Sequence, residues 1–499
     1  MTQEKKRHPL SAQGNPSAWD QRASRRSFLK AAGSAGAAGA VVLGAPLIGA
    51  GTAEGALQNQ RPYLFTICAA GGASIIDSFL AQPRGPGSYP NLVRPAGSML
   101  SAAPVLNNSI QGQITLGNGY AQSTFLTKHG ADTVVMTCEV SSVNHQVAAR
   151  RAITGDNVNG GRTIQEAVSL KYGQSLPIAN LMLAGGGYAS RGDDITIPEW
   201  ARGQVIVDPL MFAFATHGSK AINQNLSGDE IAQIRKLRKQ LESQSVAVNQ
   251  LQNGKVFDNY IANRDRVTEM LEKGDAITKL MMLDPATNNL QSFGLQTSPD
   301  LTLLQSKFPR LASDPYESRM ALAFLAVKNQ ISTAVTVSPP MAPLLTAQSS
   351  PNTPIAFDWS HVDHRGAQNT MWSYILKSVD GLIDLLKATP DPLEPQKKMW
   401  DKSLVYIATE FGRDKIATGG SGHHLNNGVV MISPLLEGNR IFGDVDQNTG
   451  LTYGFNPATG ESMPGTKMNE RDIYSALATA LEIEFCGRKT MTAMVRKRP

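Results

Sequence analysis

The chain has 499 residues, of which 41% are hydrophobic and 18% are charged, and its formal net charge is +6. This composition is ordinary for a soluble globular protein and excludes a collagen-like or largely disordered chain. Part of the positive charge lies near the N-terminus, and no stripe of Lys and Arg is interleaved with aromatic residues, so no nucleic-acid partner is predicted. The three cysteines, Cys68, Cys138 and Cys486, are too few for a disulfide framework, although one bond between two of them stays open.

The N-terminal stretch 24–30 contains a pair of arginines, an apolar pair and a trailing lysine, and it resembles the twin-arginine export motif. An uncharged run rich in Ala and Gly follows, and small residues after it indicate a cleavage site. Residues 1–56 are therefore predicted to be a signal peptide and linker, with the twin-arginine translocase as partner during export. The mature protein is expected to be periplasmic or secreted. A retained membrane anchor is the alternative, but Pro46 and the many glycines disfavour a stable span.

The mature part of the chain alternates between short apolar runs and amphipathic helical patterns. The runs are typical of buried strands, because they are apolar and bounded by turn residues. Their alternation with helices predicts an α/β fold with a mostly parallel sheet and helices on both faces. Residues 57–499 are expected to form one such domain. The expected strands are 63–70, 132–140, 179–184, 332–338, 404–408 and 428–433.

The middle of the chain, about 220–330, is expected to be a helical insertion. Three amphipathic patterns occur there, around 231–241, 267–280 and 315–331. A Ser-x-x-Glu capping box precedes the first pattern. The apolar stripes of these helices are assigned to core packing.

Five of the eight histidines follow expected strands or lie in the helices after them, and carboxylates occur at the same places. In open α/β sheets, ligands bind at the carboxyl ends of the strands. Imidazole and carboxylate groups suit one or two divalent ions, and two ions about 4 Å apart would clamp both oxygens of a displacement at phosphorus or sulfur. A purely structural role for these histidines stays open. The predicted metal ligands are Asp77, Asp358, His361, Asp363, His364, Glu410, His423 and His424.

Several short motifs together carry a resemblance to a known family. They are Gly71-Gly72-Ala73, the helix from His145 to Thr154-Gly155, Glu410-Phe411-Gly412-Arg413, the loop with His423-His424, and Ile441-Phe442-Gly443. The chain is similar in these to a large family of twin-arginine-exported bacterial proteins, catalogued as a domain of unknown function and placed by fold in the alkaline phosphatase/sulfatase superfamily. The resemblance implies an alkaline-phosphatase-like fold and one or two divalent ions, with zinc, calcium or manganese as candidates.

The chain departs from the pattern of this superfamily at three places. The nucleophile position, occupied there by Ser, Thr or Cys, falls on His145. Ser74 follows Gly-Gly-Ala where the family usually has an acidic residue, and Asp77 comes three residues later. The last loop has His423-His424 in place of an Asp-His pair. His145 is therefore a candidate catalytic residue, either as a metal ligand or in a site that activates bound water.

Two functions follow from these observations. The first is an exported metal-dependent hydrolase of phosphate or sulfate esters, acting on a small-molecule or polymer ester, with Arg413 in bidentate contact with the anionic substrate. The second is an exported binding or assembly protein that keeps the fold without turnover. The dense ligand set favours the first, and the missing nucleophile favours the second. Alanine at His364 and His424 is expected to abolish metal binding and leave the fold intact.

Overall fold

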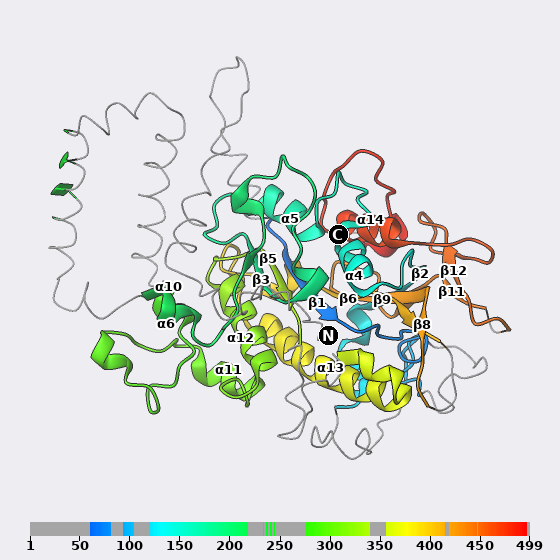
Figure 1. Cartoon of the computed structure of the whole chain (residues 1–499), viewed down its shortest axis with the longest axis horizontal. Coiled ribbons are helices and arrows are strands. Elements are labelled where there is room, and N and C mark those ends of the chain that lie inside the picture. The colour runs from blue at the N-terminus through cyan, green and yellow to red at the C-terminus, as the bar shows by residue number, and fades with distance from the viewer. Residues whose placement is uncertain are drawn as a thin grey trace, which may run out of the picture.

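An eight-stranded sheet forms the centre of the molecule, with strand order β10-β2-β9-β6-β1-β5-β3-β4 (Figure 1). It is seen in a computed structural model that describes residues 60–80, 93–103, 120–217, 276–339, 356–414, 419–446 and 448–496, and six separate residues between 233 and 244. The strands are β1 (Tyr63–Ala69), β2 (Thr133–Glu139), β3 (Asn180–Leu183), β4 (Gln204–Val205), β5 (Ala334–Val337), β6 (Ser403–Thr409), β9 (Asn426–Ile432) and β10 (Arg440–Phe442). Neighbours are parallel except β9, which runs antiparallel to both β2 and β6.

The two central strands, β1 and β6, are buried along their whole length. Their register runs from Tyr63 opposite Ser403 to Ala69 opposite Thr409. Strands that are covered on both faces are expected to be apolar throughout, and both sequences have this character. Side chains alternate between the two faces, so Phe65 and Ile67 enter one core and Leu64 and Cys68 enter the other.

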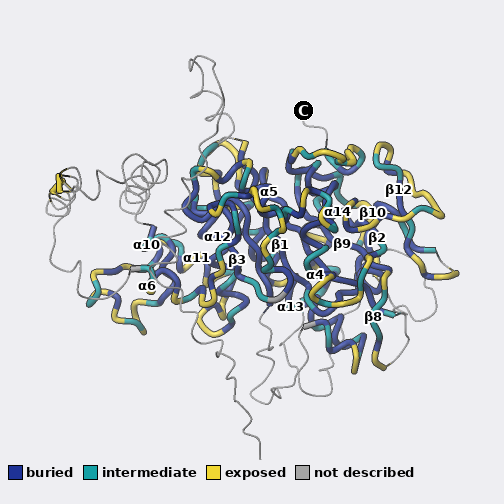
Figure 2. Tube along the Cα trace, turned by 45° about the horizontal axis from the view of Figure 1, so that its top comes forward, coloured by how far each residue is buried: buried dark blue, intermediate teal, exposed yellow. Residues whose placement is uncertain are grey.

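Helices cover both faces of the sheet, and Figure 2 shows the buried strands between them. The first core contains α3 (Gln122–His129), α6 (Phe212–His217), α10 (Ala276–Leu280), α11 (Leu301–Lys307), α12 (Pro315–Lys328) and α13 (His364–Ala388). The second contains α4 (His145–Thr154), α5 (Ile164–Tyr172) and α14 (Glu470–Ala480). The predicted α/β fold, with a mostly parallel sheet covered on both faces, is therefore confirmed.

Two smaller sheets complete the strands. One pairs β7 (Gly412–Arg413) with β8 (His423–His424), and the other joins β11 (Asp444–Val445), β12 (Thr452–Phe455) and β13 (Ser462–Met463). The β7–β8 pair follows β6 directly and carries residues of the predicted site. It thereby fixes the position of the His pair relative to the end of β6.

The expected helical insertion is only partly visible. Its third helix is observed as α12, which packs into the same core as α13 and β5. Most of 218–275 lies outside the described residues, so the insertion stays a prediction. The predicted signal peptide, 1–56, also lies outside them. Among the described helices, none is long and apolar enough to cross a lipid bilayer.

Candidate metal centre

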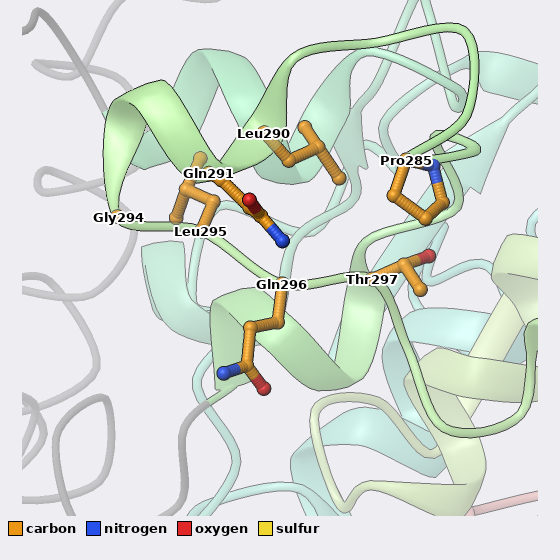
Figure 3. Close-up of a pocket in the computed structure, with 7 residues that line it drawn as sticks. All are labelled: Pro285, Leu290, Gln291, Gly294, Leu295, Gln296 and Thr297. Atoms are coloured by element: carbon orange, nitrogen blue, oxygen red, sulfur yellow. The ribbon is translucent and has the colours of Figure 1, made fainter.

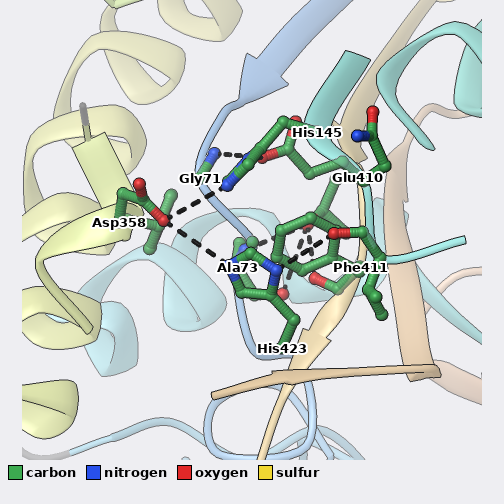
Figure 4. A network of polar contacts seen from close by, with 12 residues as sticks. Gly71, Ala73, His145, Asp358, Glu410, Phe411 and His423 are labelled. Carbon is green, nitrogen blue, oxygen red and sulfur yellow. Dashed lines mark hydrogen bonds and ion pairs between the residues drawn. The ribbon is translucent and has the colours of Figure 1, made fainter. Parts of the chain in front are cut away.

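Three predicted site residues come together beyond the ends of β1 and β6 (Figure 4). They are His145 at the start of α4, Asp358 on a short 3-10 turn (Ala356–His361), and His423 on β8. One ligand atom from each lies within 4.8 Å of the others. Asp358 Oδ1 is 3.6 Å from His145 Nε2 and 3.8 Å from His423 Nε2. We refer to His145, Asp358 and His423 as the metal centre, a name for a candidate site.

Local sequence places His145 at this point. Asn144 caps α4 by accepting a hydrogen bond from the Val147 N–H, so the helix begins at His145. Gly155 ends the helix in the left-handed conformation, with φ of 60°. Because α4 follows β2 after a short connection, its first turn lies close to the other residues of the site.

Glu410 orients the imidazole of His145. His145 Nδ1 lies 2.7 Å from Glu410 Oε1, and the Gly71 N–H donates to the same oxygen at 2.6 Å. This hydrogen bond raises the pKa of His145, and the side chain of Glu410 is only 4% exposed. A carboxylate on Nδ1 leaves Nε2 as the atom that faces Asp358. Metal-ligating histidines usually have such a partner on their other nitrogen.

His423 is held by a backbone carbonyl and an aromatic ring. Its Nδ1 donates to the Val143 oxygen at 3.0 Å, since a carbonyl only accepts. Its ring stacks on Phe411, with 4.1 Å between the centroids. Burial, together with the nearby charge of Arg413, lowers the pKa of His423. The neutral ring therefore turns the lone pair of Nε2 toward Asp358.

His361 lies at the edge of the metal centre. Its Nε2 is 3.4 Å from Asp358 Oδ1 and 2.9 Å from His423 Nε2. Arg413 Nη1 lies 3.2 Å from the same nitrogen, and a guanidinium only donates, so His361 Nε2 is an acceptor. Burial and Arg413 lower the pKa of His361. Two nitrogen lone pairs then face each other, an arrangement that a proton or a metal ion between them would stabilise.

Arg413 is a buried structural cation of the site. Its side chain is 0% exposed, and its Nη2 donates to Asp358 Oδ1 at 2.9 Å. Besides His361, its other partners are the carbonyl oxygens of Gly71, Gly72, Phe357 and Ser421. These bonds occupy the N–H groups of the guanidinium. They leave none for the bidentate contact with a substrate that the sequence suggested.

Besides His361 and Glu410, four predicted ligands lie outside the metal centre. Asp77 and His364 form a buried pair, with 2.9 Å between Asp77 Oδ2 and His364 Nε2. Asp363 caps α13 by accepting the Gly366 N–H, and His424 Nδ1 accepts the Asn426 N–H at 3.0 Å. Neighbouring side chains on an extended strand point to opposite faces, which separates His424 from His423. The predicted ligand Glu410 supports His145 instead of joining the three ligand atoms.

The sequence did not single out Phe411 or the Val143 carbonyl as parts of the site. The glycine pair after β1 was the signal for a close backbone approach, and the structure shows the reason. Gly72 has φ of +82°, and a Cβ on it would lie 2.5 Å from Phe411 Cε2. The pair thus admits the ring that stacks on His423.

Two other features of the described residues are weaker candidates for the functional site. A groove between Pro285 and Thr297 has a volume of about 570 Å³, but neutral side chains line it and it shares no residue with the metal centre (Figure 3).

A second ligand group, His129 with Asp380 and Asp384, already pairs with lysines. Lys307 lies 2.7 Å from Asp384, for example. These ammonium groups neutralise the carboxylates that an ion would need.

No known family model matches the chain, and no curated protein matches it. The likeness to the alkaline phosphatase/sulfatase superfamily therefore stays a hypothesis based on the short motifs of the sequence.

Proposed function

We propose that the chain is an exported metal-dependent hydrolase of phosphate or sulfate esters, with one divalent ion held by His145, Asp358 and His423. The observation that carries this proposal is the convergence of their ligand atoms. A tetrahedral ion with bonds of about 2.0–2.2 Å has its ligand atoms about 3.3–3.6 Å apart. The distances of 3.6 and 3.8 Å from Asp358 Oδ1 are close to this spacing.

The ligand set favours zinc among the three candidate ions. Two imidazoles and one carboxylate suit zinc, whereas calcium takes about six to eight oxygen ligands. Three protein ligands with an open fourth position are typical of catalytic zinc sites. The side chains of His145 and Asp358 are 40% and 24% exposed, so a substrate has access.

The same geometry favours one ion over two. The guanidinium of Arg413 lies within hydrogen-bond distance of both Asp358 Oδ1 and His361 Nε2, so a positive charge already stands beside these atoms. Asp77 and His364, which could have served a second ion, bond to each other. A second divalent ion beside Asp358 would meet repulsion from the first ion as well as from Arg413.

The side chains of the site suit hydrolysis by direct attack of water. Among the described residues that form the metal centre and its edge, none carries a hydroxyl or thiol. A bound ion lowers the pKa of water and draws electron density from an ester oxygen. His361 is the candidate proton acceptor, because its pKa is lowered and its side chain is 46% exposed, and its Nε2 would have to release the Arg413 N–H that it accepts in this structure.

The second candidate function is an exported protein that binds a ligand or assembles with a partner without turnover. The absence of a covalent nucleophile at His145 favours it. Both functions are compatible with one ion, so turnover separates them.

The decisive experiment measures metal content and activity on the exported full-length protein. We expect one zinc ion per chain and hydrolysis of p-nitrophenyl phosphate or p-nitrophenyl sulfate. His423→Ala is expected to lose both the ion and the activity, because it removes one of three ligands. His424→Ala is the matched control and is expected to keep both. Metal without hydrolysis of either ester would favour the binding protein, and equal metal content in the two variants would overturn the site.

A further inference from the structure

Exposed apolar side chains border the metal centre, and we propose that its substrates are amphiphilic esters, in which an apolar group adjoins the phosphate or sulfate. This inference rests on the proposed function and names its substrate class. The apolar group would lie on Val143, Val362, Leu425 and Leu451, which we call the apolar rim.

Three rim residues are tied to the site by backbone contacts. The Val143 carbonyl accepts the hydrogen bond from His423, and Val362 follows His361 directly. Leu425 lies beside the same segment, because its carbonyl accepts the Val140 N–H at 2.8 Å. The exposed fractions are 39% for Val143, 44% for Val362 and 40% for Leu425. Each of these exposed apolar residues thus contacts through its backbone, or adjoins in sequence, the segments that carry His361 and His423.

Leu451 extends the rim away from the metal centre. Thr452 donates its N–H to Asn426 Oδ1 at 3.1 Å, which brings β12 next to the residue that follows Leu425. Leu451, immediately before Thr452, is 47% exposed. Through this hydrogen bond Leu451 adjoins the segment that carries Leu425.

Exposed apolar residues that stand singly are normal on protein surfaces, whereas a group of them beside a polar centre is typical of a binding surface. A small polar ester would leave the rim in contact with water. An ester with an alkyl or aryl group would bury the rim and its own apolar surface while its anionic head lies at the metal centre. Each methylene that is buried contributes about 0.8 kcal/mol to the free energy of binding, which corresponds to about a fourfold gain in affinity.

The test compares n-alkyl phosphates from ethyl to octyl, each below the concentration at which it aggregates. We expect kcat/KM to rise by up to about fourfold per methylene until the rim is covered. Binding of the matching n-alkylphosphonates, which are not hydrolysed, is expected to rise in parallel when measured by calorimetry. This second readout does not depend on turnover.

Variants of the rim residues test whether the dependence on chain length comes from the apolar rim. Val362→Ser and Leu425→Ser are expected to flatten the dependence of kcat/KM on chain length. Ile195→Ser is the control, because Ile195 is 92% exposed and is not a residue of the apolar rim. It is expected to keep the full dependence.

The outcomes separate this inference from the proposed function. Hydrolysis with no dependence on chain length would overturn the inference and keep the hydrolase. Chain-length-dependent binding of phosphonates without hydrolysis of any ester would support the rim and count against the hydrolase. An equal loss in Ile195→Ser and Val362→Ser would also overturn the inference, because the effect would then not come from the rim.

Discussion

Glu410 determines how His145 can act, because its carboxylate fixes which imidazole nitrogen carries the proton. The Gly71 N–H bonds to the same oxygen and holds the carboxylate in place. The arrangement serves both forms of the site. Without an ion the carboxylate stabilises the imidazolium, and with an ion it makes the imidazole a stronger ligand.

Glu410→Gln is expected to lower the pKa of His145 and to weaken metal binding by about 10- to 100-fold. A histidine with a raised pKa in the folded state stabilises the fold fully below its unfolded value, about 6.5, and loses this contribution as the pH rises through the folded pKa. The metal-free variant should therefore lose less stability than the parent protein as the pH rises through that range. NMR titration of His145 and denaturant unfolding at several pH values measure both effects. An unchanged pKa of His145 would contradict the assignment.

Because Asp77 and His364 form a buried pair, removing His364 should lower stability and leave metal binding intact, the opposite of what removing a metal ligand would do. His364→Ala should destabilise the fold by about 2–4 kcal/mol, because it leaves the buried side chain of Asp77 with only the Ser74 hydroxyl as a partner. It should keep the ion, whereas the sequence alone had suggested that the ion would be lost. Denaturant unfolding and metal analysis of the same preparation measure the two effects. If His364→Ala lost the ion but kept its stability, His364 would have to be assigned as a metal ligand.

At the scale of single residues, the sequence predicted the types of ligand but not their orientation. His423 and His424 are equivalent in composition and position, and only the pairing of β8 with β7 decides which one faces Asp358. Four carbonyl oxygens accept hydrogen bonds from Arg413. The local sequence does not reveal these contacts, so Arg413 was predicted to bind the substrate instead. These contacts depend on the tertiary structure.

Among the elements, the loop after β1 is the one on which the shape of the site depends. Gly71 and Gly72 have φ of +97° and +82°, values that other residues rarely adopt. The backbone of the two glycines contacts the side chains of Glu410, Phe411 and Arg413. A side chain here would displace the ring against which His423 is stacked.

Gly72→Ala is therefore expected to destabilise the fold by more than the about 1–3 kcal/mol that backbone strain alone costs, and to reduce metal affinity. Gly465→Ala is the matched control, because Gly465 has φ of +84° and no atom within 4 Å of an added Cβ. The control should show the strain alone and keep its metal affinity. Calorimetric metal titration and thermal unfolding test both. Equal effects in the two variants would show that the contact with Phe411 does not matter.

The expected strands agree with the observed ones within two residues, since strands covered on both faces are distinct apolar runs. The direction of β9 was not predicted. Parallel neighbours need a long crossover, usually a helix, and the segment between β6 and β9 contains the β7–β8 pair instead. The missing helical pattern between Thr409 and Asn426 was the available signal for an antiparallel strand.

For the molecule as a whole, an ion at the metal centre would join three distant segments of the chain. His145, Asp358 and His423 reach it from α4, the turn before α13, and β8. Because only the folded chain brings them together, the ion should stabilise the fold.

A zinc concentration 100 times the Kd is expected to raise the free energy of unfolding by about 2.7 kcal/mol. A chelator should remove this gain and lower the Tm. His424→Ala should respond to zinc as the parent protein does, and His423→Ala should not respond. A zinc-dependent Tm in His423→Ala would mean that the ion binds elsewhere.

The pairing of β1 with β6 also has a consequence for the order of events during synthesis. Gly71 and Glu410 lie 339 positions apart in the chain, yet one hydrogen bond joins them. The ribosome synthesises β1 long before β6. Until β6 has been synthesised, β1 is therefore an apolar strand without its partner on this edge. Closing so long a loop is a slow step in folding. The three residues of the metal centre can come together only after the segment through His423 has been synthesised, so an ion that binds there would be acquired late.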